Sequence, residues 1–483
     1  MAVDYDLVVI GSSLAGIYAA RKAVQLQARV ALITQSDRAY LFNDNLFNYS
    51  WGTIGRLKSL LENDFFESTD KIASSLSLAE TDNWIEDTNT AVQNINSLSN
   101  LAALGVDVII GKGKFGKSPH LELQIKQRTL RSRRFLLATG TICVPDFVED
   151  NSLNSYLTLK DLKERKLSSL PASIIVVGSN PTAIELAQNL AVFGKKVTLI
   201  VRQSRILPQE DNDINNLIQA QLEAMGIDIF TQSAVSQIKV IDRKKWLQAG
   251  DLALFADEII IADYQQPNIA GLNLASINVK YNNLRVYVNN KLETTNNKIY
   301  ACGDLIGGYC LPNVAQYEVN LVLKNALFFP LYKAKYHAVP WAILTHPSLA
   351  RVGLNEKQAR QKYGKIYVVR QYFDDVVSAR TSNYNLGMCK LLIGDRGDIL
   401  GCSLFCDRAS ELITIPALMI QQKVKLDRNP MRGLTTVSIP HIYPNMAEIL
   451  EQAINSFYLQ KIQSNPKLLN RLISWFSWRK SHL

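Results

Sequence analysis

Two stretches of the chain share one pattern: a short apolar run, a turn with glycine, and a longer run with helical periodicity. The first is YDLVVIGSSLAGIYAA over residues 5–20, followed by the apolar run ARVALIT over residues 28–34. The second is IIVVGSNPTAIELAQNL over residues 174–190, followed by KKVTLIV. Short apolar runs bounded by glycine turns indicate buried strands, and the periodic stretch between them indicates a helix. The pattern therefore predicts two βαβ units.

The first turn has the spacing of a dinucleotide-binding fingerprint, with Gly11 and Gly16 at its first and third positions. Glycine lets the backbone approach a pyrophosphate, which the N–H groups of the helix N-terminus hold. Ser13 replaces the middle glycine and adds a side chain where the phosphate comes nearest. Thr34 and Gln35 end the second run where an acid usually binds the ribose, although a hydroxyl or amide also accepts a hydrogen bond. The alternative is a βαβ unit that binds nothing.

The second turn predicts a second nucleotide. Gly178 and Ala183 fit the first and third positions, and Asn180 takes the middle, where its tolerance of positive φ makes the turn feasible. The following strand leads to Arg202 and Arg205 instead of an acid, which favours the 2′-phosphate of NADPH over the 2′-hydroxyl of NADH. The alternative is that both arginines are simply solvated on a surface loop.

Three further segments follow in order. RRFLLATGTICVP contains Ala138, Thr139 and Gly140, and KIYACGDLIGG contains Gly303 and Asp304. PWAILTHPSLARVGLNEKQA begins at residue 340. In order and spacing, these segments and the two turns resemble the pyridine nucleotide-disulfide oxidoreductase family, the group of glutathione reductase, dihydrolipoamide dehydrogenase and mercuric reductase. The resemblance covers about residues 4–463.

This resemblance implies an α/β fold with two Rossmann-like three-layer domains, one for FAD and one for NAD(P), plus a C-terminal α+β dimerisation domain. It implies FAD and NAD(P)H as cofactors, a homodimer, and a flavin contact by Ala138, Thr139, Gly140 and Gly303. It also implies that the Asp304 carboxylate accepts hydrogen bonds from the ribityl chain. The domains expected are residues 1–150 and 269–332 for FAD, 151–268 for NAD(P), 333–463 for dimerisation, and a basic amphipathic tail over 464–483.

The chain departs from the family where its redox-active Cys-x4-Cys pair belongs, because no cysteine occurs before Cys143. The corresponding segment reads DRAYLFNDNLFNYSWGT over residues 37–53. Aromatic rings beside a flavin can stack on a planar acceptor, and they can equally be core filler. The aromatic residues are Tyr40, Phe42, Phe47, Tyr49 and Trp51.

The acid–base end of the site has changed as well. The family pattern places His-x-His-Pro before a glutamate, whereas this chain has HIYPNMAE, with His441, Tyr443 in place of the second histidine, and Glu448 retained. The phenol of Tyr443 is a neutral donor at pH 7, which suits a carbonyl or quinone oxygen better than sulfur. The alternative is a buried tyrosine whose hydroxyl is satisfied by the backbone.

Glu185 matches a family glutamate that pairs with a lysine near the flavin, and Arg56 or Lys58 is the nearest candidate partner. The segment IIIADYQQPN resembles a family segment with Ala-Thr-Gly and then Arg-x-Pro-Asn, of which it retains Ala262, Pro267 and Asn268. This erosion counts against full activity.

Composition is that of a globular enzyme, with 483 residues, 47% apolar and 20% charged. The net charge of +10 comes from dispersed residues without a nucleic-acid motif, so we expect no nucleic-acid partner. Five histidines and six cysteines form no metal-site pattern, and Cys402 and Cys406 lie ~13 Å apart if both are in one strand, too far for a disulfide. The absence of a signal peptide or an apolar run of ~18 residues predicts a cytoplasmic protein.

The last segment, NPKLLNRLISWFSWRKSHL, predicts a short basic amphipathic helix with Pro466 in its first turn. Such a helix is typical of a peripheral membrane anchor, and it can also pack on its own domain or on a dimer partner. Its apolar stripe is Leu468, Leu469, Leu472, Ile473 and Phe476, with Trp475 and Trp478 at the margin and Lys467, Arg471, Arg479 and Lys480 as the basic residues.

These observations predict an FAD-dependent NAD(P)H oxidoreductase that passes a hydride from nicotinamide to flavin and electrons on to a quinone, another small oxidant or oxygen. The alternative is a degenerate scaffold or a regulatory subunit without turnover. True disulfide or mercuric reduction would need thiols from a partner or from the C-terminal cysteines.

Overall fold

In the computed structural model of the protein, the N-terminal apolar run forms β1 (Tyr5–Ile10), in the middle of a seven-stranded sheet. β1 pairs in parallel with β2 (Val30–Thr34) and with β6 (Arg128–Leu137). Helix α1 (Leu14–Gln25) connects β1 to β2, so the first predicted βαβ unit is present. The other strands are β3 (Asp107–Ile110), β4 (Gly113–Phe115), β5 (Glu122–Ile125) and β17 (Ile299–Ala301).

The structure describes residues 3–35, 50–56, 78–95, 97–116, 121–145, 155–308, 310–382, 386–434 and 439–482. The chain forms two compact units. Unit 1 comprises Met1–Ile206 and Glu223–Ala334, and unit 2 comprises Leu207–Leu222 and Lys335–Leu483.

The second apolar pattern forms another parallel sheet of unit 1, in the order β11-β10-β9-β15-β8. β9 (Ser173–Val177), α7 (Pro181–Val192) and β10 (Lys196–Ile200) are the second predicted βαβ unit. The other strands are β8 (Leu157–Thr158), β11 (Asp228–Phe230) and β15 (Glu258–Ile261), and an antiparallel sheet is formed by β12 (Val235–Ile241), β13 (Lys244–Ala249) and β14 (Leu252–Ala256).

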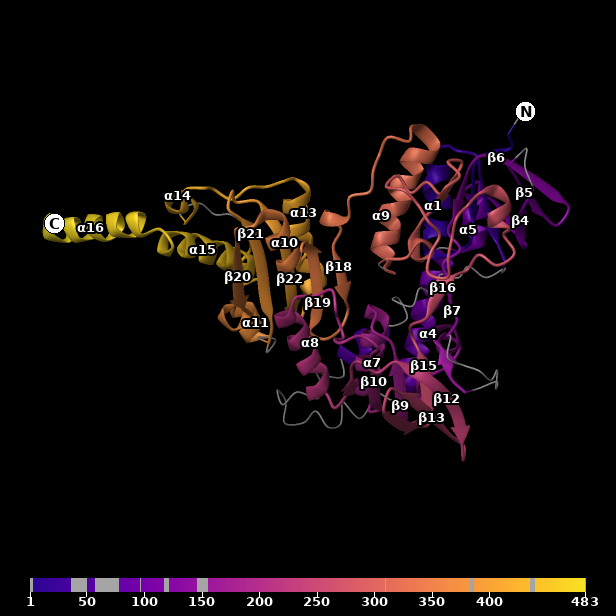
Figure 1. Cartoon of the computed structure of the whole chain (residues 1–483), viewed down its shortest axis with the longest axis horizontal. Helices are drawn as coiled ribbons and strands as arrows, with labels where there is room; N and C mark the ends of the chain where they lie inside the picture. Colours follow the sequence, from indigo (N-terminus) through magenta and orange to yellow (C-terminus); the bar gives the residue numbers. More distant parts are fainter. Residues whose placement is uncertain are drawn as a thin grey trace. The chain divides into compact units, whose positions relative to one another are not determined.

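The seven-stranded sheet and the parallel sheet are joined through a two-stranded antiparallel ribbon of β7 (Thr141–Cys143) and β16 (Gln265–Pro267). Helices α1 and α9 (Pro312–Leu323) pack against each other beside the first sheet (Figure 1). Other helices of this part are α4 (Leu78–Ile95), α5 (Leu98–Ala103), α6 (Leu159–Lys163) and the end of α8 (Asn212–Ala224).

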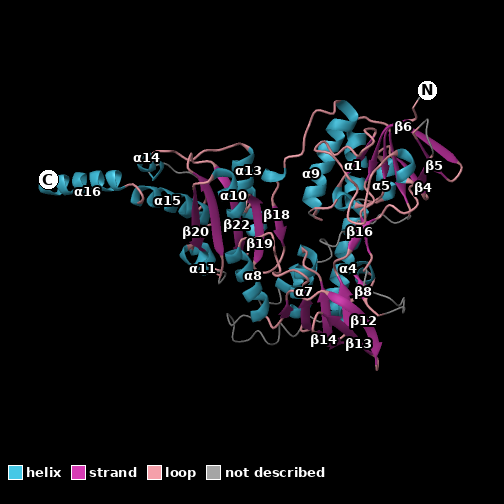
Figure 2. Cartoon of the chain, in the orientation of Figure 1, coloured by secondary structure: helices cyan, strands magenta, loops and turns pink. Residues whose placement is uncertain are grey.

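Unit 2 is built on an antiparallel sheet in the order β18-β19-β22-β21-β20, with α15 (Glu448–Gln463) packed on it (Figure 2). Its strands are β18 (Trp341–Ile343), β19 (Ser348–Gly353), β20 (Ile366–Tyr372), β21 (Met388–Gly394) and β22 (Ile399–Cys406). Its other helices are α10 (Glu356–Tyr363), α11 (Val377–Thr381), α12 (Ala409–Leu412), α13 (Thr414–Gln421), α14 (Pro430–Leu434) and α16 (Pro466–His482).

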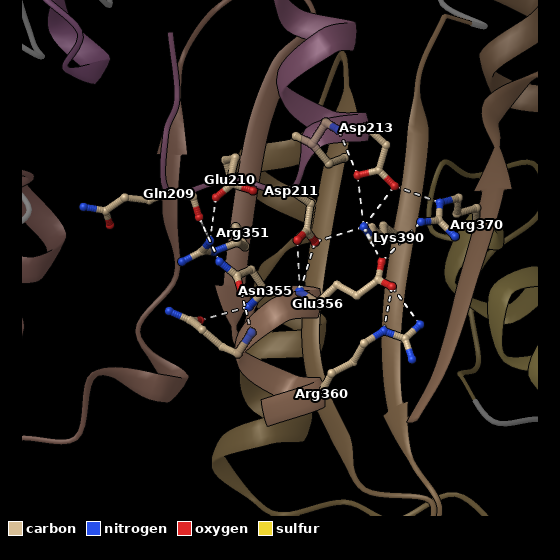
Figure 3. A network of polar contacts seen from close by, with 12 residues as sticks. Gln209, Glu210, Asp211, Asp213, Arg351, Asn355, Glu356, Arg360, Arg370 and Lys390 are labelled. Atoms are coloured by element: carbon tan, nitrogen blue, oxygen red, sulfur yellow. Dashed lines mark hydrogen bonds and ion pairs between the residues drawn. The ribbon is translucent and has the colours of Figure 1, made fainter. Parts of the chain in front are cut away.

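A buried ion cluster ties the segment 207–222 to this sheet (Figure 3). The Lys390 ammonium, on β21, lies 3.0 Å from Asp211, 2.9 Å from Asp213 and 2.9 Å from Glu356. We refer to these four residues as the Lys390 cluster. Lys390 is only 2% exposed, so its charge is compensated by carboxylates and not by water. The cluster explains why α8 belongs to unit 2 as far as Leu222.

The predicted α/β fold, with two Rossmann-like domains and a C-terminal α+β domain, is confirmed by these sheets. The helix predicted in the last segment is confirmed as α16. Cys402 and Cys406 both lie on β22, as expected for two thiols too distant for a disulfide. Among the described residues, no helix has the length and apolar character needed to cross a membrane.

Candidate cofactor-binding site

A cavity of about 670 Å³ opens in unit 1 at the carboxyl ends of β1 and β2. Its volume lies within the range of small-molecule and cofactor sites. The carboxyl edge of a parallel sheet is also where such sites form. The cavity brings together seven of the predicted residues, namely Gly11, Ser13, Thr34, Thr139, Gly140, Gly303 and Asp304.

The glycines of the first turn are required by close backbone contacts. Gly11 has φ +110°, and a Cβ atom there would lie 2.3 Å from the carbonyl oxygen of Ala138. A Cβ atom on Gly16 would lie 2.0 Å from the carbonyl oxygen of Gly11. Two atoms that are not bonded to each other cannot lie this close. The strand, the turn and the helix can therefore meet only with glycine at both positions. Gly16 and the fully buried Ala138 do not line the cavity, but they pack against the turn that does.

Ser13 lines the cavity, and its side chain is held within the turn by hydrogen bonds. It is the N-cap of α1, and its hydroxyl donates a 2.7 Å hydrogen bond to the carbonyl of Ala138 and accepts one from the N–H of Gly16 at 3.3 Å. A serine N-cap satisfies a helix N–H that would otherwise lack a partner. The substitution therefore stabilises the turn.

Thr34, the residue expected to contact a ribose, lies at the end of β2 and forms part of the cavity wall. Its side chain is 1% exposed, and its hydroxyl is 2.8 Å from the hydroxyl of Ser12. The hydroxyl of Thr34 is thus paired with a second hydroxyl at the cavity wall.

The hydroxyl oxygen of Thr139 is a buried polar atom in the cavity lining. Within the described residues its hydroxyl oxygen has no hydrogen-bond partner, although it lies in the cavity lining. The turn around it is held by Asn268, whose N–H donates to the carbonyl of Gly140 at 3.0 Å. Buried polar atoms are nearly always paired in folded proteins, so Thr139 indicates a polar ligand.

The Gly303-Asp304 turn closes the cavity beside α9. Gly303 has φ +71°, and its N–H donates a 2.7 Å hydrogen bond to the carboxylate of Glu318, which is 3% exposed on α9. This buried glutamate fixes the turn that presents Asp304 to the cavity. Sequence reasoning missed Glu318, although a carboxylate within the apolar helix PNVAQYEVNLVL is a signal that could have revealed it.

Two lysines of α6 also line the cavity and were not predicted. Lys160 and Lys163 come from the helix that follows β8, in the second sheet of unit 1. They place positive charge beside the backbone turns and hydroxyls of the cavity lining. An anionic pyrophosphate is the ligand that this combination favours. No local motif marks these lysines, because only the packing of α6 brings them to the cavity.

The second turn follows β9 and keeps the predicted spacing. Gly178 has φ +155°, and a Cβ atom there would lie 2.9 Å from the Cβ of Ala183. The tolerance of asparagine for positive φ is not needed at Asn180, because its φ is −88°. Asn180 is instead the N-cap of α7, and its side chain accepts a 2.8 Å hydrogen bond from the N–H of Ala183.

Arg202 and Arg205 follow β10 directly, in the loop at its carboxyl end. β10 pairs in parallel with β9, so this loop and the Gly178 turn emerge from the same edge of the sheet. The two arginines are therefore placed where the ribose of a nucleotide on the second turn is expected.

Glu185 lies on α7 and is 2% exposed. The helical segment 50–56 packs on α7, since a Cβ atom on Gly55 would lie 3.2 Å from Val192. Arg56 is on that segment, while Lys58 lies outside the described residues. Trp51 is 1% exposed and is therefore core filler. The other predicted aromatic residues, Tyr40, Phe42, Phe47 and Tyr49, also lie outside the described residues.

In unit 2, Tyr443 was expected to be either a donor to an acceptor oxygen or a buried tyrosine whose hydroxyl is satisfied by the backbone. Tyr443 is 67% exposed, so the expectation of a buried, backbone-satisfied tyrosine is wrong. His441 lies 3.3 Å from the carboxylate of Glu451. Glu448 begins α15 and accepts a 2.9 Å hydrogen bond from Gln452. The phenol of Tyr443 is thus presented on the surface of unit 2.

Within the described residues, no group of histidine, cysteine and acidic side chains is arranged to hold a metal ion. All six cysteines are free thiols, and two of them, Cys143 and Cys302, line the cavity. Burial raises the pKa of the Cys302 thiol well above its usual value, and the carboxylates of Glu318 and Asp304 raise that pKa further. Cys143 donates a hydrogen bond to the carbonyl of Asp263 at 3.3 Å.

Comparison with known proteins places this geometry in a family. The family described as pyridine nucleotide-disulphide oxidoreductase matches residues 5–319, and the dimerisation domain of the same family matches residues 339–454. A mercuric reductase from Staphylococcus aureus is 27% identical over 463 residues, covering 94% of this chain and 82% of that protein. RclA from Escherichia coli, a probable pyridine nucleotide-disulfide oxidoreductase, is 27% identical over 426 residues, covering 86% of this chain and 92% of RclA.

Solved structures agree on the fold. The structure of LpdA from Mycobacterium tuberculosis superposes with a TM-score of 0.81 at 20% identity, covering 93% of this chain and 99% of LpdA. A structure of the flavoprotein disulfide reductase RclA from Escherichia coli gives a TM-score of 0.79 at 24% identity, covering 94% of this chain and all of RclA. The match to the dimerisation domain indicates a homodimer. With both domain models matched across most of its length, the chain belongs to the pyridine nucleotide-disulphide oxidoreductase family.

Proposed function

We propose that this protein is an FAD-dependent oxidoreductase that takes a hydride from NADPH and passes electrons to an acceptor other than a disulfide, such as a quinone. Its family uses FAD and NAD(P)H. One observation carries the proposal: the cavity keeps the backbone turns of a flavin site, while the chain has no cysteine before Cys143. The cofactor site is therefore retained without the family's dithiol.

The residues present fit FAD. The turn at Gly11 has no room for a side chain. The buried Thr139 hydroxyl can form a hydrogen bond with a polar group of the cofactor. Asp304 places a carboxylate in the cavity that can accept hydrogen bonds from ribityl hydroxyls. Lys160 and Lys163 add positive charge for the pyrophosphate. When bound, FAD supplies a ring that accepts a hydride and gives up electrons to a second substrate. The protein's part is to orient that ring and to exclude competing reactions.

Three of the remaining thiols, those of Cys302, Cys389 and Cys406, are poor substitutes for the missing pair. A thiolate is the species that attacks a disulfide, and the raised pKa of Cys302 keeps this residue protonated at neutral pH. A hydrogen bond with Cys402, together with burial, raises the pKa of Cys389. Burial likewise raises the pKa of Cys406, in the core of unit 2. These thiols support a structural role and no redox relay.

Arg202 and Arg205 support NADPH as the electron donor. Guanidinium groups bind a 2′-phosphate through paired, charge-assisted hydrogen bonds, and no acidic residue follows β10 to bind a 2′-hydroxyl instead. The Gly178 turn and the N-terminus of α7 supply the pyrophosphate contact. We assign Glu185 on α7 to positioning the residues on the nicotinamide side of the flavin.

Tyr443 is the residue we assign to the acceptor. Its phenol is exposed, neutral at pH 7, and able to donate a hydrogen bond to a quinone oxygen as negative charge develops there. In a homodimer this exposed segment of one protomer can reach the site of its partner. Glu448 follows five residues later, at the start of α15, as a positioning residue for this segment.

The test is NADPH oxidation by the flavin-loaded protein with a water-soluble quinone, with glutathione disulfide and with oxidised lipoamide. We expect saturable turnover with the quinone and none with either disulfide. Tyr443→Phe should lower kcat/KM for the quinone by about three- to tenfold, the worth of one hydrogen bond. The control Tyr372→Phe removes the hydroxyl of another exposed tyrosine of unit 2 and should leave the rate unchanged. Turnover with a disulfide would contradict the proposal.

A second candidate is a regulatory or interaction subunit that binds FAD structurally or not at all. The observation in its favour is Thr34, which replaces the usual acid and already contacts the hydroxyl of Ser12. A colourless purified protein that takes up no added FAD would establish this second function and exclude the first.

A further inference from the structure

Helix α16 presents a group of large apolar side chains to solvent. The side chains on the opposite flank of its stripe are half-buried, and the helix contacts α15. Figure 1 shows α16 extending from the end of α15 away from the sheet of unit 2. The α16 apolar surface consists of Ile473, Trp475, Phe476 and Trp478, which are between 53% and 59% exposed.

The helix is a defined element that begins with its own cap. The side chain of Asn465 accepts a hydrogen bond from the N–H of Leu468 at 3.2 Å, and its carbonyl accepts one from the N–H of Leu469 at 3.0 Å. The rings of Trp475 and Trp478 stack with centroids 5.4 Å apart. The match to the family's dimerisation domain ends at residue 454, before this helix. The α16 apolar surface is thus an addition to the shared fold.

The charge of α16 identifies the kind of surface that complements it. Residues 464–483 contain no aspartate or glutamate, and Lys467, Arg471, Arg479 and Lys480 contribute four of the positive charges behind the net +10. A second copy of the chain presents the same basic helix, so like charges oppose docking of α16 on α16. The complement is an anionic surface that also has an apolar layer.

A bilayer with anionic lipids has both properties. Tryptophan favours the headgroup level, where its ring is buried and its N–H remains solvated. A basic residue near such a membrane contributes attraction that falls off within a Debye length. A nucleic-acid backbone supplies the negative charge, but it offers no apolar layer in which Ile473 and Phe476 could be buried.

We propose that α16 binds the surface of an anionic lipid bilayer, lying in the plane of the interface with the α16 apolar surface inserted. A helix of 17 residues is ~25 Å long and lies flat on the membrane. This inference is independent of the proposed redox function, because it rests on α16 alone and its test measures binding.

The experiment is flotation of the full-length protein with vesicles of phosphatidylcholine alone or of phosphatidylcholine with phosphatidylglycerol. We expect at least about tenfold stronger partitioning to the anionic vesicles. Phe476→Ser should weaken it by about tenfold. The matched control Phe255→Ser removes a phenylalanine that is equally exposed on β14 and should have no effect.

A charge-matched pair completes the test. Arg479→Glu with Lys480→Glu should abolish binding to anionic vesicles, whereas Lys357→Glu with Lys362→Glu on α10 changes the net charge equally and should preserve it. A blue shift of tryptophan emission on adding anionic vesicles should accompany binding.

Equal binding to both vesicle types, or to neither, would overturn the proposal. So would a loss of self-association in Phe476→Ser with vesicle binding unchanged, since a second copy would then cover α16. Binding of the wild-type protein to a single-stranded oligonucleotide but to no vesicle would identify nucleic acid as the partner and overturn it as well.

Discussion

Replacing Lys390 by methionine tests the electrostatics of unit 2. The ammonium of Lys390 lies within 3.0 Å of carboxylate oxygens of Asp211, Asp213 and Glu356, in a setting where the lysine is 2% exposed (Figure 3). Methionine matches the aliphatic stem of lysine, so Lys390→Met removes the charge while retaining most of the packing.

The magnitude follows from the partners that remain. Arg370 stays 2.8 Å from Asp213 and 3.3 Å from Glu356, so these two carboxylates keep a cation. Asp211 keeps the N–H of Glu356, which donates to it at 3.1 Å, but it loses the ammonium of Lys390. Removing one partner from a buried ion pair costs about 3–5 kcal/mol. We expect Lys390→Met to lower the free energy of unfolding by that amount.

The assay is urea unfolding at pH 7, followed by circular dichroism for the whole chain and by flavin fluorescence for unit 1. Lys365→Met is the matched control, because Lys365 pairs with Asp395 at 3.3 Å with its side chain 73% exposed. An exposed pair is worth less than about 1 kcal/mol, so the control should be nearly neutral. A cost below about 1 kcal/mol for Lys390→Met would refute the reasoning.

The pH dependence of the same variant has a defined sign. Burial raises the pKa values of Asp213 and Glu356, but hydrogen bonds from Lys390 and from arginines outweigh it, so both pKa values are lowered. The resulting stability is present above the carboxylates' unfolded pKa values and is lost as pH falls through the lowered values. Without Lys390 the burial effect gains weight, so the cost of Lys390→Met should shrink as the pH is lowered from 7 to 4.

Three further predictions concern the two units separately. Gly11→Ala should lower the flavin-to-protein ratio of the purified protein, because a Cβ there would lie 2.3 Å from a carbonyl oxygen, whereas Gly105→Ala, also at positive φ but with no atom within 4 Å, should retain its flavin. Glu210 is buried in unit 2, 2.7 Å from Arg351 on β19. Burial outweighs this ion pair and raises the pKa of Glu210 to about 7, above its ordinary 4.5, so wild-type stability falls as pH rises between these values by at most ~3 kcal/mol. Glu210→Gln should flatten this part of the pH profile of urea unfolding, and an unchanged slope would contradict the assignment. Arg202→Glu with Arg205→Glu should raise the KM for NADPH by at least about tenfold and leave that for NADH within about threefold, and an equal rise for both would count against recognition of the 2′-phosphate.

The sequence predicted most of the fold because its signals are local. An apolar run, a glycine turn and a helical stretch follow one another within about 30 residues in each βαβ unit. The glycines of the first turn were found for the same reason, since Gly11 and Gly16 are spaced by the geometry of one strand and one helix. The tail helix was predicted from its own periodicity and capping residues.

The rest depends on contacts between distant segments. Lys160 and Lys163 reach the cavity only because α6 packs beside the first sheet's turns, and the Lys390 cluster joins residues more than 140 positions apart. The pattern of apolar and polar residues also did not predict the hydrogen bonds of individual side chains. The sequence singled out Ser13 for its side chain near the phosphate and Asn180 for its tolerance of positive φ. It did not show that each of them is the N-cap of a helix.

The most direct test of the central claim is a pair of separate anaerobic reductive titrations of the flavin-loaded protein, one with dithionite and one with NADPH. A flavin without a dithiol takes two electrons, so one equivalent should bleach the absorption band near ~450 nm completely, and NADPH should bleach it as well. A requirement for two equivalents would reveal a second two-electron centre such as a disulfide and would contradict the account. A protein that binds FAD but is not bleached by NADPH would contradict it equally.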